Sequence, residues 1–314
     1  MWGLEKLWLF LYWQLRPLVK WFLRKTTKLC ELQRICYGKP AGCLRSQAVE
    51  FSLYHSRSTE IKTMIARLEE AARKKELSGA VQKAALGYAV KTVVMVKGIN
   101  MEYHRPFVKS FGRCVEHIWG YKQLYNEVES LRLTQFDSND PKHEEILMRL
   151  WNAMKPHNRL EARITKQWQD IGFQGDDPKT DFRGMGMLGL ENLVYFGEEY
   201  SGAAVHVLSH SLHPQYGYAY AIVGINITSL AYDLLKDGSL KTHVYNACKS
   251  MPTLRVFHLL YCYLFYEFDK FWVESKPKDV MEFTFIKDKF ETNIRNSLAD
   301  PTTTFKINFV VDTI

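Results

Sequence analysis

The sequence predicts an all-α fold, and three observations support this prediction. Apolar residues recur three and four positions apart through most of the chain, which is the period of a helix with one buried side. Residues typical of helix starts and ends separate these stretches. Alternation typical of a β-strand occurs only in the tail, from Phe305 to Val311. With 314 residues and 46% hydrophobic content, the chain can bury a core in one large or two modest domains, which argues against a disordered protein.

The segment MWGLEKLWLFLYWQLRPLVKWFLRK at the amino terminus predicts an amphipathic helix at a membrane surface. Its uncharged run, Leu7 to Leu15, is too short to span a bilayer, which takes about 20 apolar residues. Three basic residues share one stripe of the helix: Arg16, Lys20 and Arg24. Apolar surface elsewhere comes from Trp13, Leu18, Trp21 and Phe22. Pro17 favours a bent interfacial helix, although a core helix with solvated charges and a re-entrant hairpin remain alternatives.

A helical lead region follows. One exposed amphipathic helix is expected where four apolar residues repeat at helical spacing: Ile61, Met64, Ile65 and Leu68. A second helix is expected from Phe107 to Leu133, with a less regular segment near Gly98 to Arg105 before it.

The sequence DSNDPKHEE marks a domain boundary, which we place just before the helix that it introduces. Asp140 can cap this helix, and Pro141 lies in its first turn, where proline loses no hydrogen bond. The helix is expected to end at Pro156 and to bury one side, formed by Ile146, Leu147, Leu150, Trp151 and Met154.

The next helix is expected to begin at Asn158, because Glu161 three residues later completes a capping-box pattern. It would bury Leu160, Ile164, Trp168 and Ile171 and end at Gly172. The stretch QGDDPKTDFRGMGMLGL, from Gln174 to Leu190, begins as a loop, because proline, four glycines and three aspartates oppose regular structure. Helix is expected to resume near Met187.

Three further helices are expected to form the core of the carboxy-terminal half. The stretch from Tyr216 to Leu235 has no charge before Asp233, but its polar residues and tyrosines favour a buried helix over a membrane span. Large apolar residues, four of them aromatic, then recur at the spacing of a packed helix face, a pattern that a cofactor box would share: Phe257, Tyr261, Leu264, Phe268 and Phe271. A last helix is expected to start at Asp279.

No metal site is predicted, because three groups of potential ligands each lack the pattern of a known site. The six cysteines form no C-x-x-C pair, and no secretory signal precedes them, which indicates reduced thiols in the cytosol. The gaps between Cys30, Cys36 and Cys43 do not fit the ligand spacing of structural zinc. Asp176, Asp177 and Asp181 lack the glycine and glutamate of a calcium loop. The histidines of HVLSHSLHP, which are His206, His210 and His213, lack the glutamate of H-E-x-x-H.

Common nucleotide and hydrolase motifs are also excluded. The glycines from Gly184 to Gly189 match G-x-G-x-x-G, but a proline-broken acidic loop precedes them where a strand is required. The chain contains no phosphate-binding P-loop and no G-x-S-x-G elbow. The net charge of +8 and the pI of about 9.0 favour an acidic partner, an anionic membrane or nucleic acid without choosing among them.

Arg183 lies where the loop meets the following helix and is the residue with the clearest chemical use. A guanidinium presented outward can bind phosphate oxygens and neutralise charge in the active site of a partner GTPase. Spacing alone, however, favours an ion pair with Asp177 or Asp181 that closes the loop. Asp181 can also cap the following helix.

Long parts of the chain resemble the ELMO domain-containing proteins, in particular the small ELMOD-type members. The resemblance rests on ARITKQWQDIGFQGDDPKTDFRGMGMLGLENLVYF from Ala162 to Phe196, on GYAYAIVGINITSLAYDLL, on CYLFYEFDKFW and on CELQRI. It implies a multi-helix ELMO domain, which we place at 139–300. From the residue patterns above, we expect a membrane-associating helix at 1–30 and a helical lead region at 31–138 before this domain, and a tail at 301–314 after it. The stretch from Gly38 to about Phe107 departs from the family and receives no assignment.

The family resemblance implies a GTPase-activating protein for Arf- and Arl-type small GTPases, with Arg183 as the arginine finger. The other residues that match the family signature are expected to shape the loop or bind the partner, and Asp177 is grouped with them: Trp168, Gln174, Asp177, Pro178, Asp181, Gly184, Gly186 and Asn192. Gln174 has the alternative role of orienting the attacking water. An adaptor without catalytic effect, as in larger ELMO proteins, is the alternative function.

The resemblance also sets expectations for cofactors, partners and location. No cofactor is expected, because GTP and Mg²⁺ belong to the partner GTPase. The expected partners are GTP-bound Arf/Arl GTPases and a membrane surface reached through residues 1–25, with no nucleic acid. The expected location is the cytoplasm, at intracellular membranes.

Overall fold

The computed structural model describes the backbone of residues 2–309 and the side chains of residues 14–309, and within this range every regular element is helical. The chain divides into two compact units, residues 1–120 and 121–314. The first unit contains α1 (Trp2–Thr27), α2 (Glu31–Gly38), α3 (Cys43–Tyr54), α4 (Thr59–Arg73), α5 (Gly79–Lys97) and the first half of α6 (Arg105–Leu133).

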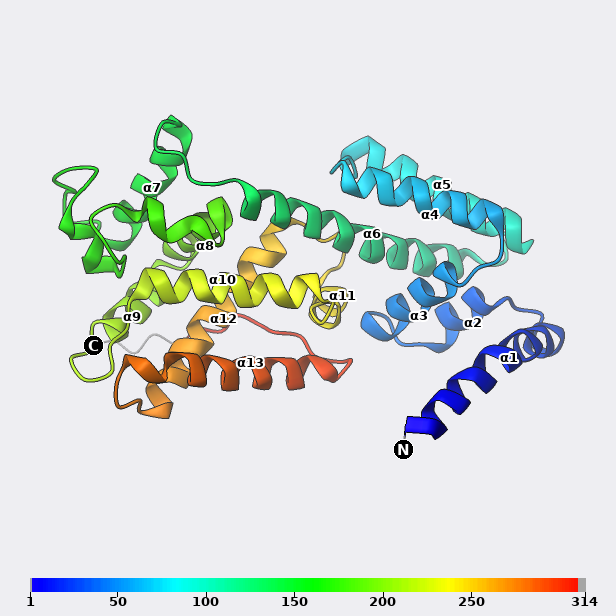
Figure 1. The fold of residues 1–314 in the computed structure, drawn as a ribbon. Coiled ribbons are helices and arrows are strands. Elements are labelled where there is room, and N and C mark those ends of the chain that lie inside the picture. Colours follow the sequence, from blue (N-terminus) through cyan, green and yellow to red (C-terminus); the bar gives the residue numbers. More distant parts are fainter. Residues whose placement is uncertain (1, 310–314) are drawn as a thin grey trace. The chain divides into compact units, whose positions relative to one another are not determined.

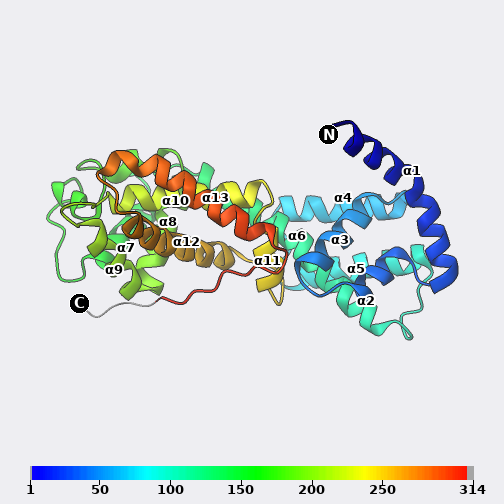
Figure 2. The same ribbon diagram turned by 90° about the horizontal axis from the view of Figure 1, so that it is seen from below.

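The second unit holds the end of α6 and the remaining elements (Figure 1). These are α7 (Pro141–Met154), the 3₁₀ helices η1 (Lys166–Ile171) and η2 (Pro178–Arg183), α8 (Gly186–Glu199), α9 (Ser201–Ser211), α10 (Tyr220–Lys236), α11 (Lys241–Ala247), α12 (Leu254–Ser275), η3 (Val280–Glu282) and α13 (Phe283–Ala299). Helix α8 packs against α7, α10 and α12, and the views of Figures 1 and 2 place α10, α12 and α13 side by side.

The helix predicted from Tyr216 to Leu235 is confirmed as a buried core element. Twelve of the seventeen residues of α10 are buried, and they form the centre of the second unit. No described helix is long and apolar enough to cross a membrane. The start signals around Asp140 are also confirmed, because its side chain accepts the Lys142 N–H at 2.9 Å and Pro141 opens α7.

The helix predicted to begin at Asn158 is wrong. Residues 158–165 are irregular, and Ile164 is 64% exposed. The backbone here forms longer-range bonds instead: the Asn158 carbonyl accepts the indole N–H of Trp151 at 2.7 Å, and the Thr165 N–H donates to the Asp176 carbonyl at 2.9 Å. Only the last turns are helical, and they end at Gly172 in a left-handed conformation, as predicted.

The alternating pattern of the tail does not form a strand within residues 305–309, and Val310 and Val311 lie outside the described residues. The aromatic side chains pack on helices instead. Phe305 stacks on Tyr263 at 4.7 Å between ring centroids, and Phe309 lies 4.6 Å from the ring of Tyr266. Within residues 305–309, the two aromatic residues of the alternating pattern therefore pack on helices and do not pair with another strand.

Helix α1 continues through Pro17, and its basic and apolar sides have different environments. On its basic stripe, Arg16 and Lys20 contact Glu31 of α2 at 3.3 and 2.6 Å. Five large apolar side chains are instead exposed: Leu15, Leu18, Val19, Trp21 and Phe22. The basic stripe thus faces the protein, whereas the apolar side faces outward. Trp13 lies outside the residues whose side chains are described.

Candidate functional site

The loop that carries Arg183 consists of the two 3₁₀ helices η1 and η2 and the turn between them. Asp177 is the residue that caps η2, because its side chain accepts the Lys179 N–H at 3.0 Å. Pro178 follows as the first residue of η2 and is buried. Asp181 does not cap a helix, contrary to one of its predicted roles. It closes the loop by accepting the backbone N–H of Gln174 at 3.0 Å.

The loop is anchored by a cluster of buried aromatic rings. Phe182 is fully buried, and its ring centroid lies 5.6 Å from Phe173 and 5.8 Å from Phe136. Trp168 is also fully buried and packs edge-on against Phe173 and Trp151. Aromatic pairs of this geometry stabilise a fold by about 0.5–1.5 kcal/mol beyond the area that they bury. The backbone next to Arg183 is therefore anchored to the core through the buried ring of Phe182.

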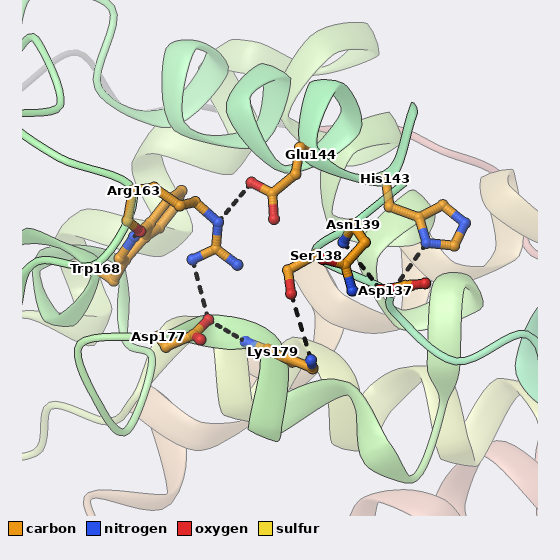
Figure 3. Close-up of polar contacts among 9 residues, drawn as sticks. All are labelled: Asp137, Ser138, Asn139, His143, Glu144, Arg163, Trp168, Asp177 and Lys179. Atoms are coloured by element: carbon orange, nitrogen blue, oxygen red, sulfur yellow. Dashed lines mark hydrogen bonds and ion pairs between the residues drawn. The ribbon is translucent and has the colours of Figure 1, made fainter. Parts of the chain in front are cut away.

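Arg163 joins the loop to α7. Its guanidinium lies between Glu144 and Asp177, at 2.5 and 3.0 Å from their carboxylate oxygens (Figure 3). Burial opposes the charge on Arg163, but the hydrogen bonds that its guanidinium donates to both carboxylates raise its pKa above the usual value. The Arg163 carbonyl also accepts the indole N–H of Trp168 at 2.9 Å. One residue thus connects the cap of η2, helix α7 and the aromatic cluster.

A second contact ties the loop to the segment before α7. The Lys179 ammonium lies 3.3 Å from the hydroxyl of Ser138, as Figure 3 shows. That segment is itself ordered by Asp137, whose carboxylate accepts the Asn139 N–H at 2.9 Å and whose N–H donates to His143 at 3.0 Å. The loop is therefore fixed by two sets of contacts, one with α7 through Arg163 and one with the segment before α7 through Lys179.

Arg183 is exposed, and its side chain forms no hydrogen bond or ion pair with any described residue. The predicted ion pair with Asp177 or Asp181 is wrong, because Asp177 pairs with Arg163 and Asp181 bonds to the Gln174 backbone. The side chain of Gln174 is exposed as well, and no contact within residues 14–309 fixes it. Two of the predicted site residues are thus available to a partner.

The two glycines after Arg183 differ in what their positions require. Gly186, the first residue of α8, has φ +53, and a Cβ there would lie 2.4 Å from the carbonyl oxygens of Arg132 and Thr134. The end of α6 and the start of α8 approach closely at this point, where the Met187 N–H donates to the Thr134 carbonyl at 2.8 Å. Gly184 has no atom near its Cβ position and ordinary helical angles.

Asn192 lies in the core of the second unit and not in the loop. It is 0% exposed, and its amide group donates to the Thr228 hydroxyl at 3.1 Å. Its amide oxygen accepts from Nδ1 of His258 at 2.7 Å. Burial lowers the pKa of His258 to about 4, so the ring is neutral near pH 7 and carries its proton on Nδ1. Asn192 therefore joins α8 to α10 and α12, and a direct contact with a partner is excluded.

The histidines of the HVLSHSLHP stretch lie apart from the loop. His206 and His210 come together with Asp269, their ligand atoms all within 4.8 Å, whereas His213 stacks on Tyr216. Asp269 accepts from Nδ1 of His210 at 2.7 Å and from the Tyr218 hydroxyl at 2.6 Å. Burial raises the pKa of Asp269, while these two hydrogen bonds act in the opposite direction. The arrangement is explained by the connection that it makes between α9 and α12.

Sequence reasoning did not identify Arg163, Glu144 or Phe182 as part of this site. The sequence does contain a signal for Phe182, because a single aromatic residue between an aspartate and an arginine in a polar loop indicates a ring that is buried and fixes the loop to the core. The pair of Arg163 and Glu144 carries none, because nineteen positions separate the two residues and the helix assumed around Arg163 is absent.

The chain is similar to ELMO proteins over most of its length. The sequence model described as the ELMO/CED-12 family matches residues 126–287. ELMO domain-containing protein 2 from Homo sapiens is 46% identical over 295 residues, which cover 94% of this chain and 96% of the relative. ELMO domain-containing protein 1 from Bos taurus is 44% identical, with 90% and 88% covered, and ELMO domain-containing protein B from Dictyostelium discoideum is 35% identical, with 88% and 92% covered.

These matches also correct one expectation. The stretch from Gly38 to about Phe107 was expected to depart from the family, yet 94% of the chain is covered by the match to the human relative. Most of that stretch must therefore lie within the matched region.

Proposed function

Because the chain belongs to the ELMO/CED-12 family, with close similarity to its small ELMO domain-containing members, we propose that it is a GTPase-activating protein for Arf- and Arl-type small GTPases. Arg183 is the arginine finger in this proposal. The observation that carries it is the position of Arg183, exposed and without a bonding partner among the described residues, on a loop anchored by buried aromatic rings.

The chemistry takes place in the partner. GTP and Mg²⁺ are bound by the GTPase, and negative charge develops on the phosphoryl oxygens and the leaving group as the terminal bond breaks. A guanidinium inserted beside these oxygens donates two parallel hydrogen bonds and neutralises the charge. Arginine fingers accelerate hydrolysis by about 10³ to 10⁵.

The anchored loop contributes by limiting the loss of entropy on insertion. Phe182 is buried directly before Arg183, so the backbone that carries the arginine is already anchored in the free protein. Gln174 has an exposed side chain in the same loop, and the proposal does not require it to orient the attacking water.

The decisive test is single-turnover GTP hydrolysis by several Arf-family GTPases with wild-type protein and with Arg183→Lys and Arg183→Ala. We expect both variants to lose most of the acceleration. Lysine keeps the charge but lacks the planar fork of donors, and alanine lacks both. Binding of Arg183→Lys to the GTP-bound GTPase should persist. No acceleration by wild-type protein with any tested GTPase would refute the proposal.

The exposure of Arg183 also suits a second function, that of an adaptor binding small GTPases or exchange-factor partners at membranes. An exposed arginine can pair with an acidic residue of a partner and change no rate. The same experiment separates the two functions, because an adaptor would bind the GTPase and leave hydrolysis at its intrinsic rate with or without Arg183.

We also propose that α1 contacts a membrane through its exposed apolar side. Trp21 and Phe22 are 63% and 59% exposed, and a helix with such a side is stabilised by burial at the lipid headgroup boundary. Replacing Leu18, Trp21 and Phe22 by serine should reduce sedimentation with neutral phosphatidylcholine vesicles. Unchanged sedimentation would contradict the membrane contact without affecting the proposed activation of GTPases.

A further inference from the structure

The first unit contains a pocket of about 290 Å³ that has no part in the proposed GTPase contact. It is lined by α1, the start of α2, the end of α3 with the turn after it, the start of α4 and the end of α5. Its volume is near the lower limit of small-ligand pockets, which measure about 300–1,000 Å³.

The lining of this pocket is strongly basic. Five cationic side chains and a single carboxylate line it, together with His55. The cationic residues are Arg16, Lys20, Arg24, Arg57 and Lys97, and the carboxylate is Glu31. Positive charges gathered in one concave site repel one another and attract anions.

Glu31 does not neutralise all of this charge, because its two oxygens are already engaged. Oε1 lies 3.3 Å from Arg16, and Oε2 lies 2.6 Å from both the Lys20 ammonium and the Ser52 hydroxyl. Burial raises the pKa of Glu31, but hydrogen bonds from Lys20 and Ser52 outweigh it and lower the pKa below the usual value. The carboxylate is therefore ionised and committed to two of the five cations.

The other three cations have no carboxylate partner among the described residues. Arg24 donates to the Lys97 carbonyl at 3.1 Å, which orients its guanidinium at the end of α5. The side chains of Arg57 and Lys97 form no hydrogen bond or ion pair within residues 14–309. Each comes from a different element, so sequence periodicity alone does not account for their presence in one pocket.

We propose that this pocket binds a phosphate-bearing anion held by Arg24, Arg57 and Lys97. A phosphate group carries about −1.5 to −2 charges near pH 7 and offers three strong acceptor oxygens, which suits several converging cations better than a single carboxylate does. Arginine forks match its geometry, and lysine adds a compact charge. A phosphorylated lipid headgroup and a soluble polyphosphate present the same chemistry, and the experiment below separates them.

The first arm measures binding of inositol trisphosphate to the full chain by isothermal titration calorimetry at physiological salt. Arg57→Gln/Lys97→Gln should weaken binding about tenfold or more, because two charge-assisted hydrogen bonds are lost. The matched control, Lys62→Gln/Lys83→Gln, removes two exposed charges of the same unit outside the pocket and should bind as wild type. Circular dichroism verifies that all proteins are folded.

The second arm measures sedimentation with phosphatidylcholine vesicles that contain either phosphatidylinositol bisphosphate or phosphatidylserine at equal surface charge. Preference for the inositol lipid that the pocket variant loses assigns the site to a lipid headgroup. Binding of inositol trisphosphate without that preference assigns it to a soluble phosphate. No binding of inositol trisphosphate together with equal retention on both vesicles, or equal losses in the pocket and control variants, would overturn the proposal.

Discussion

Two glycines lie on either side of Met185, and only one of them has a backbone that requires glycine. Gly186 has a left-handed φ and faces two carbonyl oxygens at 2.4 Å from its Cβ position, whereas Gly184 has open space there. Gly186→Ala should therefore destabilise the protein by about 2 kcal/mol or more. Gly184→Ala should change stability by less than about 0.5 kcal/mol. Urea unfolding followed by circular dichroism measures both, and equal effects would contradict the close approach of α6 to α8.

Arg163 stabilises the loop, and its removal should affect both stability and activation. Arg163→Ala leaves Glu144 and Asp177 without their shared partner in a partly buried site, so we expect a loss of about 2 kcal/mol, below the value for a fully buried pair. Arg149→Ala breaks a single, more exposed ion pair with Glu198 and serves as the control, with a loss of about 1 kcal/mol or less. Thermal unfolding compares the two variants.

The activity of these two variants distinguishes positioning from chemistry. Arg163→Ala retains Arg183, so the rate at saturating activator should fall less than in Arg183→Ala, while the concentration needed for half-maximal acceleration should rise. Arg149→Ala should match wild type in both quantities. A rate as low as that of Arg183→Ala would mean that Arg163 does more than position the loop.

At the level of elements, His258 connects α12 to α8 and makes this packing dependent on pH. Burial lowers the pKa of His258 to about 4 in the folded state, whereas an unfolded histidine titrates near 6.5. The unfolded state therefore takes up the proton first, and stability is full above about pH 6.5 and is lost as pH falls toward 4. We expect His258 to account for a loss of about 2 kcal/mol between pH 7 and pH 5.

His258→Gln should reduce this pH dependence, because glutamine can still donate to Asn192 but does not titrate. Urea unfolding at both pH values measures it. His243, whose pKa burial also lowers to about 4, should continue to contribute in the variant. An unchanged difference in stability between pH 7 and pH 5 would show that His258 is not the titrating group.

The sequence predicted the elements of the second unit where local and tertiary preferences agree. Asp140 and Pro141 begin α7 as expected, and the apolar run of α10 is buried in the core. The prediction was wrong at Asn158, where the Trp151 indole takes a carbonyl that a helix would have used. The ion pair predicted between Arg183 and an aspartate of the acidic loop was also wrong. Asp177 pairs instead with Arg163, a contact between distant segments that local spacing does not reveal.

At the scale of the whole molecule, the net charge of +8 should make association with an acidic surface dependent on salt. The Debye length falls from about 30 Å at 0.01 M to about 8 Å at 0.15 M ionic strength, so long-range attraction to an acidic surface of the proposed GTPase partner weakens over this range. We expect the association rate with the GTPase to fall about tenfold, while the hydrolysis rate within the formed complex stays constant.

Stopped-flow association and single-turnover hydrolysis at saturating activator measure these two rates separately. Arg183→Lys keeps the net charge of +8 and should show the same salt dependence of association as wild type, despite its lost acceleration. These results would separate steering by the whole molecule from the proposed catalysis by Arg183. Steering depends on summed charge over tens of ångströms, whereas the proposed catalysis depends on bidentate geometry at contact. An association rate independent of salt would show that long-range charge does not steer the encounter.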